Sequence, residues 1–481
     1  MKSLISSMLL LLALLMPATV FAYDFEVDGI YYNINGNDVA VTNSNPWPNT
    51  YSGAVVIPAT VTYNGTTYPV TSIGEMAFYN CSALTSIVIP NSVTEIGIAA
   101  LFGCSGLTSI DIPNSVTSIG IYALRECTSL TSIVVPNSVT SIGELAFGYC
   151  PGLTSMVVES NNPRYDSRSN CNAIIETSSN TLIAACKSTI IPNSVTSIGA
   201  WSFTGSTGLT SIVIPNLVTA IGDGAFYGCT GLTSIDIPNS VTEIGGWAFG
   251  NCPGLTSIVI PNSVTEIGSM VFMNCPGLTS MVVESNNPRY DSRSNCNAII
   301  ETSSNTLIAG CKSTIIPNSV TAIGGSAFYW CDGLTSIVIP NSVTSIGELA
   351  FYHCPDLTDV YCYIADLSRV SSGNNQFLLE DGDYSGRTLH VLQGMADAYR
   401  ADVNWYPYFG QIVDDLKPDV PGDVNGDLEV NIADVNAVTD IILGGSGDPS
   451  AADVNGDGEI NIADINALIN IILGATGRVC L

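Results

Sequence analysis

Two segments near the end of the chain carry oxygen-bearing side chains at matching spacings. The first, DVNGDLEVNIAD, covers residues 423–434, and the second, DVNGDGEINIAD, covers residues 453–464. A calcium ion prefers about six to eight oxygen ligands, and a loop with oxygens at positions 1, 3, 5, 7, 9 and 12 can surround one ion. Both segments have this arrangement, with a main-chain carbonyl at position 7. The spacing predicts two bound calcium ions, with ordinary Asp- and Asn-rich turns as the alternative.

The predicted calcium ligands occupy equivalent positions in the two segments. They are Asp423, Asn425, Asp427, Glu429, Asn431 and Asp434 in the first, and Asp453, Asn455, Asp457, Glu459, Asn461 and Asp464 in the second. Position 6 of such a loop normally requires glycine for a sharp bend. The second segment has Gly458 there but the first has Leu428, so we expect the first site to be the weaker one.

Each segment leads into a short helix with one apolar face. At helical spacing these faces are Ile432, Val435, Val438 and Ile442, and Ile462, Ile465, Leu468 and Ile472. No helical pattern precedes the first segment, because residues 414–422 are polar and contain two prolines. The pattern predicts a linker followed by two loop–helix units.

These units resemble a type I dockerin, a small module that docks onto the cohesin domain of a scaffold protein. The resemblance covers residues 423–474 and implies that loop positions 10 and 11 contact the cohesin. Those positions are Ile432 and Ala433 in one copy and Ile462 and Ala463 in the other, where many dockerins carry hydroxylated residues. The identical pairs imply that either copy can face a partner. The alternative is that Ile432 and Ile462 pack between the two helices.

The composition argues against two classes of partner. Only 11% of the 481 residues are charged, and the net charge is -29, so nucleic acid is excluded as a partner because phosphate binding needs clustered Lys and Arg. Mean hydropathy is +0.35. Even so, no apolar run after the N-terminus reaches the roughly 18 residues that indicate a transmembrane helix. We expect no transmembrane segment in the mature chain.

The first 22 residues have the pattern of a secretory signal peptide. Lys2 precedes an apolar stretch over residues 4–16, and the small residues of VFA precede Tyr23. The pattern predicts a secreted or cell-surface protein. Among its 15 cysteines, Cys171 with Cys186 and Cys296 with Cys311 are the candidates for disulfides.

The middle of the chain is built from repeats. The string VTxIG begins at Val70, Val93, Val116, Val139, Val195, Val218, Val241, Val264, Val320 and Val343, so the spacing is 23 residues with two longer units of 56. Such a period predicts a solenoid, in which each unit buries its apolar face against its neighbours. The string ESNNPRYDSRSNCNAIIETSSNTLIA occurs in both longer units, 125 residues apart, which indicates internal duplication.

One repeat shows how a unit can form three apolar walls. Leu84, Ile87 and Ile89 are expected to point inward from a strand that ends before Pro90, which cannot donate to a strand ladder. The second wall comes from VTxIG and the third from an Ala-Phe pair. Most other cysteines recur every 23 residues, which predicts a stack of buried thiols and not a disulfide framework.

The array resembles the BspA-type leucine-rich repeat family through IPNSVTSIG, AFxxC and NPRYDSRSNCNAII. The resemblance covers about residues 23–416 and implies a bacterial surface or secreted protein that adheres to host proteins or cells. The expected fold is a mainly β leucine-rich repeat solenoid with a small all-α calcium-binding domain. The expected parts are a signal peptide (1–22), a β cap (23–69), the solenoid (70–360), a second cap (361–413), a linker (414–422) and the dockerin-like domain (423–474).

The variable positions beside Ala-Phe are the candidate ligand surface of the repeats. The strand face is small and uniform, as in Thr85 and Ser86, and lacks the aromatic anchors that dominate interfaces. The variable edge contains Trp201, Trp247 and Trp330, which we predict to bind a protein ligand. The alternative is that these side chains cover neighbouring repeats.

The sequence contains no catalytic constellation. His353 lies beside Cys354, but the other repeats have Gly, Tyr and Asn at its position, which indicates a surface residue. Three functions remain: an exported protein-binding or adhesion protein, a non-catalytic component of a polysaccharide-degrading complex docked through cohesin, and, with least support, a glycoside hydrolase with paired carboxylates.

Overall fold

The computed structural model describes residues 23–44, 51–373, 375–379, 382–417, 424, 430–444, 452–455 and 459–476. The predicted signal peptide therefore lies outside the described residues. The chain forms two compact units, one up to Gly231 and one from Leu232. Within the described ranges, no helix is long and apolar enough to cross a membrane.

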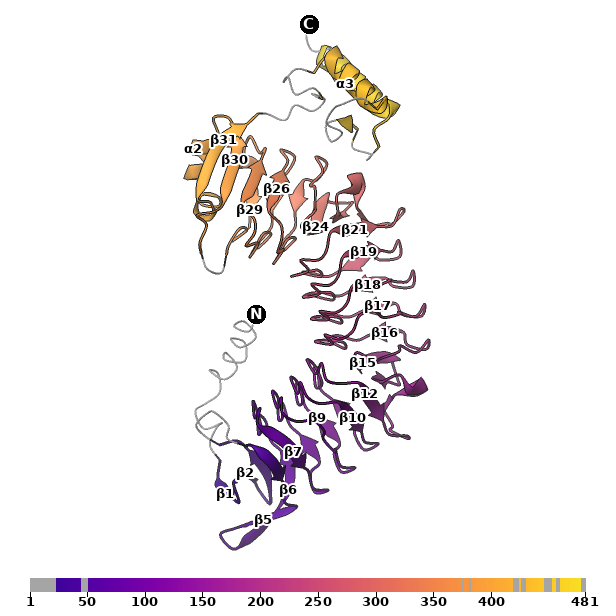
Figure 1. Cartoon of the computed structure of the whole chain (residues 1–481), viewed down its shortest axis with the longest axis vertical. Coiled ribbons are helices and arrows are strands. Elements are labelled where there is room, and N and C mark those ends of the chain that lie inside the picture. Colours follow the sequence, from indigo (N-terminus) through magenta and orange to yellow (C-terminus); the bar gives the residue numbers. More distant parts are fainter. Residues whose placement is uncertain are drawn as a thin grey trace. The chain divides into compact units, whose positions relative to one another are not determined.

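The first unit consists of short strands joined by turns (Figure 1). They are β1 (Phe25–Val27), β2 (Ile30–Asn35), β3 (Asp38–Thr42), β4 (Gly53–Val56), β5 (Thr60–Tyr63), β6 (Thr66–Ile73), β7 (Leu84–Val88), β8 (Glu95–Ile96), β9 (Ser118–Ile119), β10 (Ser132–Val135), β11 (Ser141–Ile142), β12 (Ser155–Val158), β13 (Tyr165–Asp166), β14 (Ala173–Glu176), β15 (Thr181–Ala185), β16 (Ser197–Ile198) and β17 (Ala220–Ile221), with a short 3-10 helix η1 (Arg168–Asn170).

Parallel pairing joins the repeats of this unit. The sheet order β1-β2-β3-β6-β8-β9-β11 is antiparallel in its first two pairs and parallel afterwards. The N-terminal strands thus extend the repeat sheet, and the predicted cap boundary at residue 69 falls inside β6. The first long unit interrupts the ladder, because β13-β14-β15 form an antiparallel insertion before parallel pairing resumes at β16.

The second unit contains the same kinds of strand. They are β18 (Glu243–Ile244), β19 (Ser257–Ile260), β20 (Glu266–Ile267), β21 (Ser280–Val283), β22 (Tyr290–Asp291), β23 (Ala298–Glu301), β24 (Thr306–Gly310), β25 (Ala322–Ile323), β26 (Ser336–Ile339), β27 (Ser345–Ile346), β28 (Asp359–Cys362), β29 (Ser371–Ser372), β30 (Thr388–Leu392) and β31 (Gln411–Leu416). Its helices are η2 (Arg293–Asn295), η3 (Leu367–Arg369), α2 (Ala396–Ala401), η4 (Tyr406–Tyr408), α3 (Ile432–Ile442) and α5 (Ile462–Thr476).

The three predicted walls of a coil, meaning one repeat unit, are confirmed. Leu84, Ile87 and Ile89 are buried, as are Val93 and Ile96 of the second wall and the Ala-Phe pair Ala77 and Phe78 of the third. Hydrogen bonds spaced by 23 residues join adjacent coils. The Thr94 amide donates to the Thr71 carbonyl at 2.8 Å, and the Thr94 hydroxyl donates to the same oxygen at 3.2 Å. Thr117 repeats both contacts with Thr94, which explains the threonine of VTxIG.

The repeated cysteines are buried, as predicted, except Cys331, which is half-buried. None of the 14 described cysteines forms a disulfide, and the Cys104 thiol donates to the Phe78 carbonyl of the preceding coil at 3.1 Å. The expected Cys171–Cys186 and Cys296–Cys311 disulfides are wrong. Each of these thiols has its own main-chain acceptor, such as the Asn172 carbonyl for Cys186 at 3.5 Å.

The strands beyond residue 360 continue a parallel sheet in the order β26-β28-β30-β31. Trp405 and Phe409 pack on Phe377, which stacks on the repeat residue Phe351 with ring centroids 4.9 Å apart. These aromatic rings therefore cover the end of the last coil. Arg387, also buried, donates to the carbonyls of Cys354, Leu357 and Phe377 at 2.8–3.0 Å.

Candidate functional site

The predicted calcium loops are described in part. Asn431, Asp434, Asp453, Asn455, Glu459, Asn461 and Asp464 are described, whereas Asp423, Asn425, Asp427, Glu429 and Asp457 lie outside the described residues. The described ligands include positions 9 and 12 of both loops. These two positions lie at the N-termini of α3 and α5.

Asp434 connects the first loop to the start of α3. Its side chain is fully buried, and its two carboxylate oxygens accept hydrogen bonds from the amides of Val424 and Asn431, both at 2.8 Å. The Asn431 side chain in turn accepts from the Ala433 amide at 2.8 Å. These reciprocal contacts form a capping box, which satisfies amides that the first turn of a helix leaves unpaired. Ligand positions 9 and 12 are thus held together.

The second loop repeats this arrangement 30 residues later. The buried Asp464 carboxylate accepts from the amides of Asn455 at 3.2 Å and Asn461 at 2.9 Å. The Asn461 side chain accepts from the Ala463 amide at 2.7 Å. The structure therefore brings together positions 3, 9 and 12 of this loop.

The charge of the module fits a divalent cation. Residues 418–477 contain 11 Asp and Glu residues and no Lys, Arg or His, so this segment supplies no cationic side chain for its own carboxylates. A buried carboxylate such as that of Asp434 or Asp464 is costly without a compensating charge. Carboxylate, amide and carbonyl oxygens are the ligands that calcium prefers. The residues present therefore fit calcium.

The predicted docking residues lie on the surface of the module. Ile432 and Ile462 are 68% and 70% exposed, although each is the first residue of its helix and strongly apolar. The alternative that they pack between the helices is wrong. Val438 and Leu468 are buried instead, with Val435 and Ile465 packed against them.

The apolar face of α3 differs from the one predicted from helical spacing. Ile432 and Ile442 point outward from α3, whereas Ile441 packs against the core of the module. The capping box fixes the first turn of α3 with Asp434 inward, which turns Ile432 toward solvent.

The three predicted tryptophans each contact a residue of the next coil. Trp201 meets Tyr227 edge to face at 5.8 Å between ring centroids, and Trp330 stacks on His353 at 3.9 Å. The Trp247 indole nitrogen lies 3.2 Å from the Met270 sulfur, and this side chain is 36% exposed. These contacts agree with the alternative that the aromatic edge covers neighbouring coils, and a binding role for the three residues stays a prediction.

All three tryptophans have backbones in the left-handed region, which the sequence reasoning missed. Their φ angles are 56° for Trp201, 53° for Trp247 and 55° for Trp330. Non-glycine residues occupy this region rarely and at a cost. For Trp330 the available signal was the recurrence of Gly and Asn at equivalent positions, such as Gly205 and Asn274, since these residue types adopt this conformation most easily. Trp201 and Trp247 occupy a different repeat position, where Gly224 is the one such residue and gives a weaker signal.

The Cys354–His353 pair lacks the properties of a catalytic pair. Burial raises the pKa of the Cys354 thiol to about 12, and the thiol donates to the Phe328 carbonyl at 3.1 Å. A reactive cysteine requires a thiolate near neutral pH. The His353 ring is stacked on Trp330, so it belongs to the aromatic edge.

The model of the BspA type leucine rich repeat region matches residues 61–176, 178–301 and 304–377, in six copies. The model of the dockerin type I domain matches residues 421–473. A search of curated proteins finds no match.

Several solved structures are similar to this chain. A leucine-rich repeat protein from Bacteroides ovatus is 28% identical, with 81% of this chain and 100% of that chain covered and a TM-score of 0.41. A leucine rich cell surface protein from Faecalibacterium prausnitzii is 25% identical, with 82% and 95% covered and a TM-score of 0.39. The pneumococcal vaccine antigen PcpA is 16% identical, with 82% and 100% covered and a TM-score of 0.41.

The family assignment rests on the repeats, whose matched ranges span nearly two-thirds of the sequence. The stacked coils, the parallel ladders and the two capped loop–helix units agree with both matched models. The chain belongs to the BspA-type leucine-rich repeat family and ends in a type I dockerin domain.

Proposed function

We propose that this protein is an exported, non-catalytic binding protein. Its coils hold a protein ligand, and its dockerin domain, ordered by two calcium ions, attaches it to a cohesin-type partner outside the cell. The dockerin match supports calcium binding and a cohesin-type partner. The signal-peptide pattern of residues 1–22 supports export.

The exposed isoleucine at the start of each dockerin helix carries the docking half of this proposal. Ile432 and Ile462 occupy equivalent positions, each is followed by a half-buried alanine, and each lies two residues before a buried loop carboxylate. The dockerin type I match supports a contact role for these residues, because the resemblance implies that loop positions 10 and 11 contact the cohesin. Since the two copies present the same residues, either can dock.

The docking proposal is tested with the full chain and a panel of purified cohesin domains, in calcium and in chelator. We expect calcium-dependent binding to at least one cohesin. Ile432→Glu should be tolerated alone because Ile462 remains, whereas Ile432→Glu with Ile462→Glu should abolish binding. Leu443→Glu, at an exposed apolar residue at the other end of α3, is the matched control. Binding that persists in the double variant would refute the role of these residues.

The function of the coils has two candidates. Adhesion to host proteins is supported by membership of the BspA-type family, and a non-catalytic role in a polysaccharide-degrading complex is supported by the dockerin. Chelator separates them, because it removes docking without touching the coils. Host-protein binding that survives chelation supports adhesion, whereas association with a polysaccharide-degrading scaffold that is lost in chelator supports the second role.

A further inference from the structure

A cavity of about 270 Å³ lies where the first long unit interrupts the coils of the first unit. It separates the coil of β11 from the coil of β16, although the two coils still touch where the Tyr149 amide donates to the Thr204 carbonyl at 3.0 Å. Ile142 is only partly buried here, as is Ile267 beside the second long unit, whereas their equivalents Ile96 and Ile119 are covered by the next coil. The insertion thus leaves an open space with an apolar wall.

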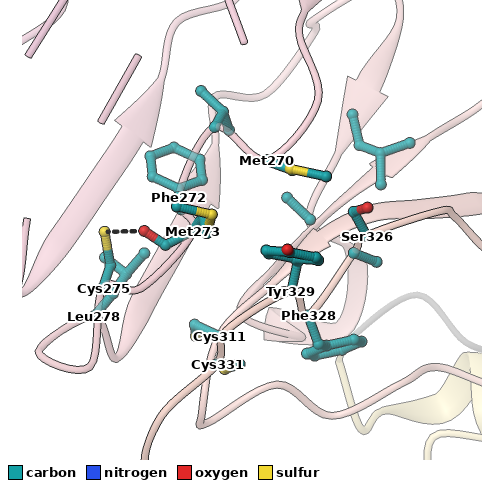
Figure 2. Close-up of a pocket in the computed structure, with 15 residues that line it drawn as sticks. Met270, Phe272, Met273, Cys275, Leu278, Cys311, Ser326, Phe328, Tyr329 and Cys331 are labelled. Carbon is teal, nitrogen blue, oxygen red and sulfur yellow. Dashed lines mark hydrogen bonds between the residues drawn. The ribbon is translucent and has the colours of Figure 1, made fainter. Parts of the chain in front are cut away.

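The duplicated copy of this place is closed. Residues 150–184 and 275–309 are identical, yet eight of the 18 residues that line the first cavity differ from their equivalents 125 positions later. Met270 and Met273 replace Leu145 and Gly148, and only about 20 Å³ remains, room for about one water. Figure 2 shows the Met270 side chain pointing toward Ser326 and Tyr329.

Two groups suited to a cation are present in the open copy and absent from the closed one. Glu144 and Trp201 line the open cavity, and serine replaces both in the second copy, as Ser269 and Ser326. The Glu144 side chain is exposed and has no ion-pair partner among the described residues. A tryptophan ring attracts ammonium and guanidinium groups more strongly than other aromatic rings do.

The other two charged residues of the cavity, Arg164 and Glu176, pair with each other at 3.1 Å. Arg164 also donates to the Thr140 carbonyl at 3.0 Å. Arg289 makes the same contacts in the closed copy, with Glu301 at 3.1 Å and the Thr265 carbonyl at 2.8 Å. Because this pair is neutral overall, Glu144 leaves the open cavity with a net negative charge. The net charge of -29 on the whole chain also favours a cationic ligand over an anionic one.

We propose that this cavity binds the cationic end of a lysine or arginine side chain of a partner protein. Glu144 and Trp201 recognise the charge, and Leu145 and Ile183 contact the aliphatic stem. The cavity is smaller than the roughly 300–1,000 Å³ of sites for drug-sized ligands, so it fits one side chain and not an oligosaccharide. The proposal rests on the protein-binding function proposed above and names the chemistry of the partner.

The probes are N-acetyl-lysine amide, N-acetyl-arginine amide, the uncharged N-acetyl-norleucine amide and methyl glucoside, titrated into the full chain and followed by ligand-observed NMR. We expect at least one cationic probe to bind at least tenfold more tightly than the norleucine probe, with affinity falling as salt rises. Equal binding of norleucine, or tighter binding of the glucoside, overturns the proposal.

Variants that copy the closed site locate the binding. Trp201→Ser should weaken binding about tenfold, equivalent to about 1.4 kcal/mol. Glu144→Ser should weaken it a few-fold, since exposed ion pairs are weak. Ala146→Val with Gly148→Met should abolish it by filling the space. Glu95→Ser removes an equally exposed carboxylate outside the cavity and should change nothing.

Each variant must keep the circular dichroism spectrum and the melting temperature of the parent. We expect Glu144→Ser and Trp201→Ser to do so, because the second copy has serine at both equivalent positions. Unchanged binding in both Trp201→Ser and the filled variant refutes the site. Cohesin binding by the same samples reports separately on the docking proposal.

Discussion

A side chain in one coil is constrained by the residue 23 positions along, because the two occupy equivalent places in adjacent coils. Trp201 shows this dependence. A Cβ built on Gly224 would collide with its indole ring, so the ring can lie where it does only above a glycine. In the duplicated copy Ser326 is equivalent to Trp201 and Leu349 is equivalent to Gly224. There the larger side chain belongs to the second coil of the pair and the smaller one to the first.

This coupling predicts the outcome of Gly224→Ala. Gly224 has a φ of 57°, where a side chain costs about 1–2 kcal/mol, and the collision with Trp201 adds to that cost. We expect a total loss of about 2 kcal/mol in the free energy of unfolding, measured in urea. In a Trp201→Ser background the loss should shrink, because only the backbone cost remains. Equal losses in both backgrounds would show that the indole is not constrained by Gly224.

Residues such as Leu84, Val93 and Ile96 could be placed from the sequence because their period fixes which way they face. Ile432 and Ile462 could not, since an apolar residue at a helix start faces inward or outward according to the capping box beside it. The free Cys171 and Cys186 were missed for a related reason. Their proximity in sequence suggested a disulfide bond, whereas in the structure each thiol donates a hydrogen bond to a nearby main-chain carbonyl.

At the scale of elements, the segment after the last repeat depends on a single buried cation. Arg387 is 2% exposed and donates to carbonyls in the last coil and in the segment that follows it. These contacts connect the irregular chain between β28 and β30 to the turn that precedes β28. The sequence showed that the 23-residue period ends here, but it did not show that β30 and β31 continue the parallel sheet.

Arg387→Met should destabilise this part of the second unit strongly. The substitution keeps much of the aliphatic stem but removes the guanidinium donors of the Leu357 and Phe377 carbonyls, whereas the Cys354 carbonyl keeps the Leu357 amide as a donor. Unsatisfied buried polar groups cost about 1–3 kcal/mol each. Because the carbonyls that lose their donors can shift and recover part of this cost, we expect the free energy of unfolding to fall by about 3 kcal/mol, measured by urea denaturation.

Arg400→Met, at an exposed arginine of α2 that pairs with Asp397 and donates to the Ile412 carbonyl, is the control. It should cost no more than about 1 kcal/mol, because its ion pair is exposed and it removes one carbonyl contact, which is only partly buried. A loss below 1 kcal/mol for Arg387→Met would contradict a stabilising role.

The two dockerin loops should bind calcium unequally. Gly458 gives the second loop the residue suited to its sharp bend, whereas Leu428 occupies that position in the first; both residues lie outside the described part of the structure. Calorimetric titration of the full chain should resolve two sites, with Asp464→Asn removing the tighter and Asp434→Asn the weaker. Leu428→Gly should narrow the difference in affinity. A single affinity in the parent protein would contradict this ranking.

At the scale of the whole molecule, the buried thiols recur along both units and share one chemical state. Burial raises the pKa values of Cys81, Cys150, Cys229 and Cys275 to about 12 each. Because the first cause is the loss of water around the sulfur, the neutral thiol is the form that the folded protein stabilises. The folded chain therefore holds these protons to higher pH than the unfolded chain does.

This difference predicts that alkali destabilises the protein. Below an unfolded-state thiol pKa of about 9 the stabilisation is complete, and above it the unfolded state binds fewer protons, so the free energy of unfolding falls until the folded pKa near 12 is reached. Each such thiol should contribute roughly 1 kcal/mol per pH unit in this window. Urea denaturation at pH 8 and pH 10 measures the loss. Cys229→Ala should reduce the slope, and equal stability at both pH values would contradict the buried neutral thiols.

In successive coils a threonine hydroxyl donates to the carbonyl of the threonine 23 residues earlier. Within a unit, a coil can therefore pack beside any neighbour that presents this threonine carbonyl. Two identical stretches, 150–184 and 275–309, lie 125 residues apart. Recombination between their coding sequences would add or remove a block of 125 residues. Each contact between neighbouring coils at the new junction would then be of a kind that the protein already contains. Genetic exchange can therefore change the length of this protein in one step, adding or removing coils while the dockerin domain is retained.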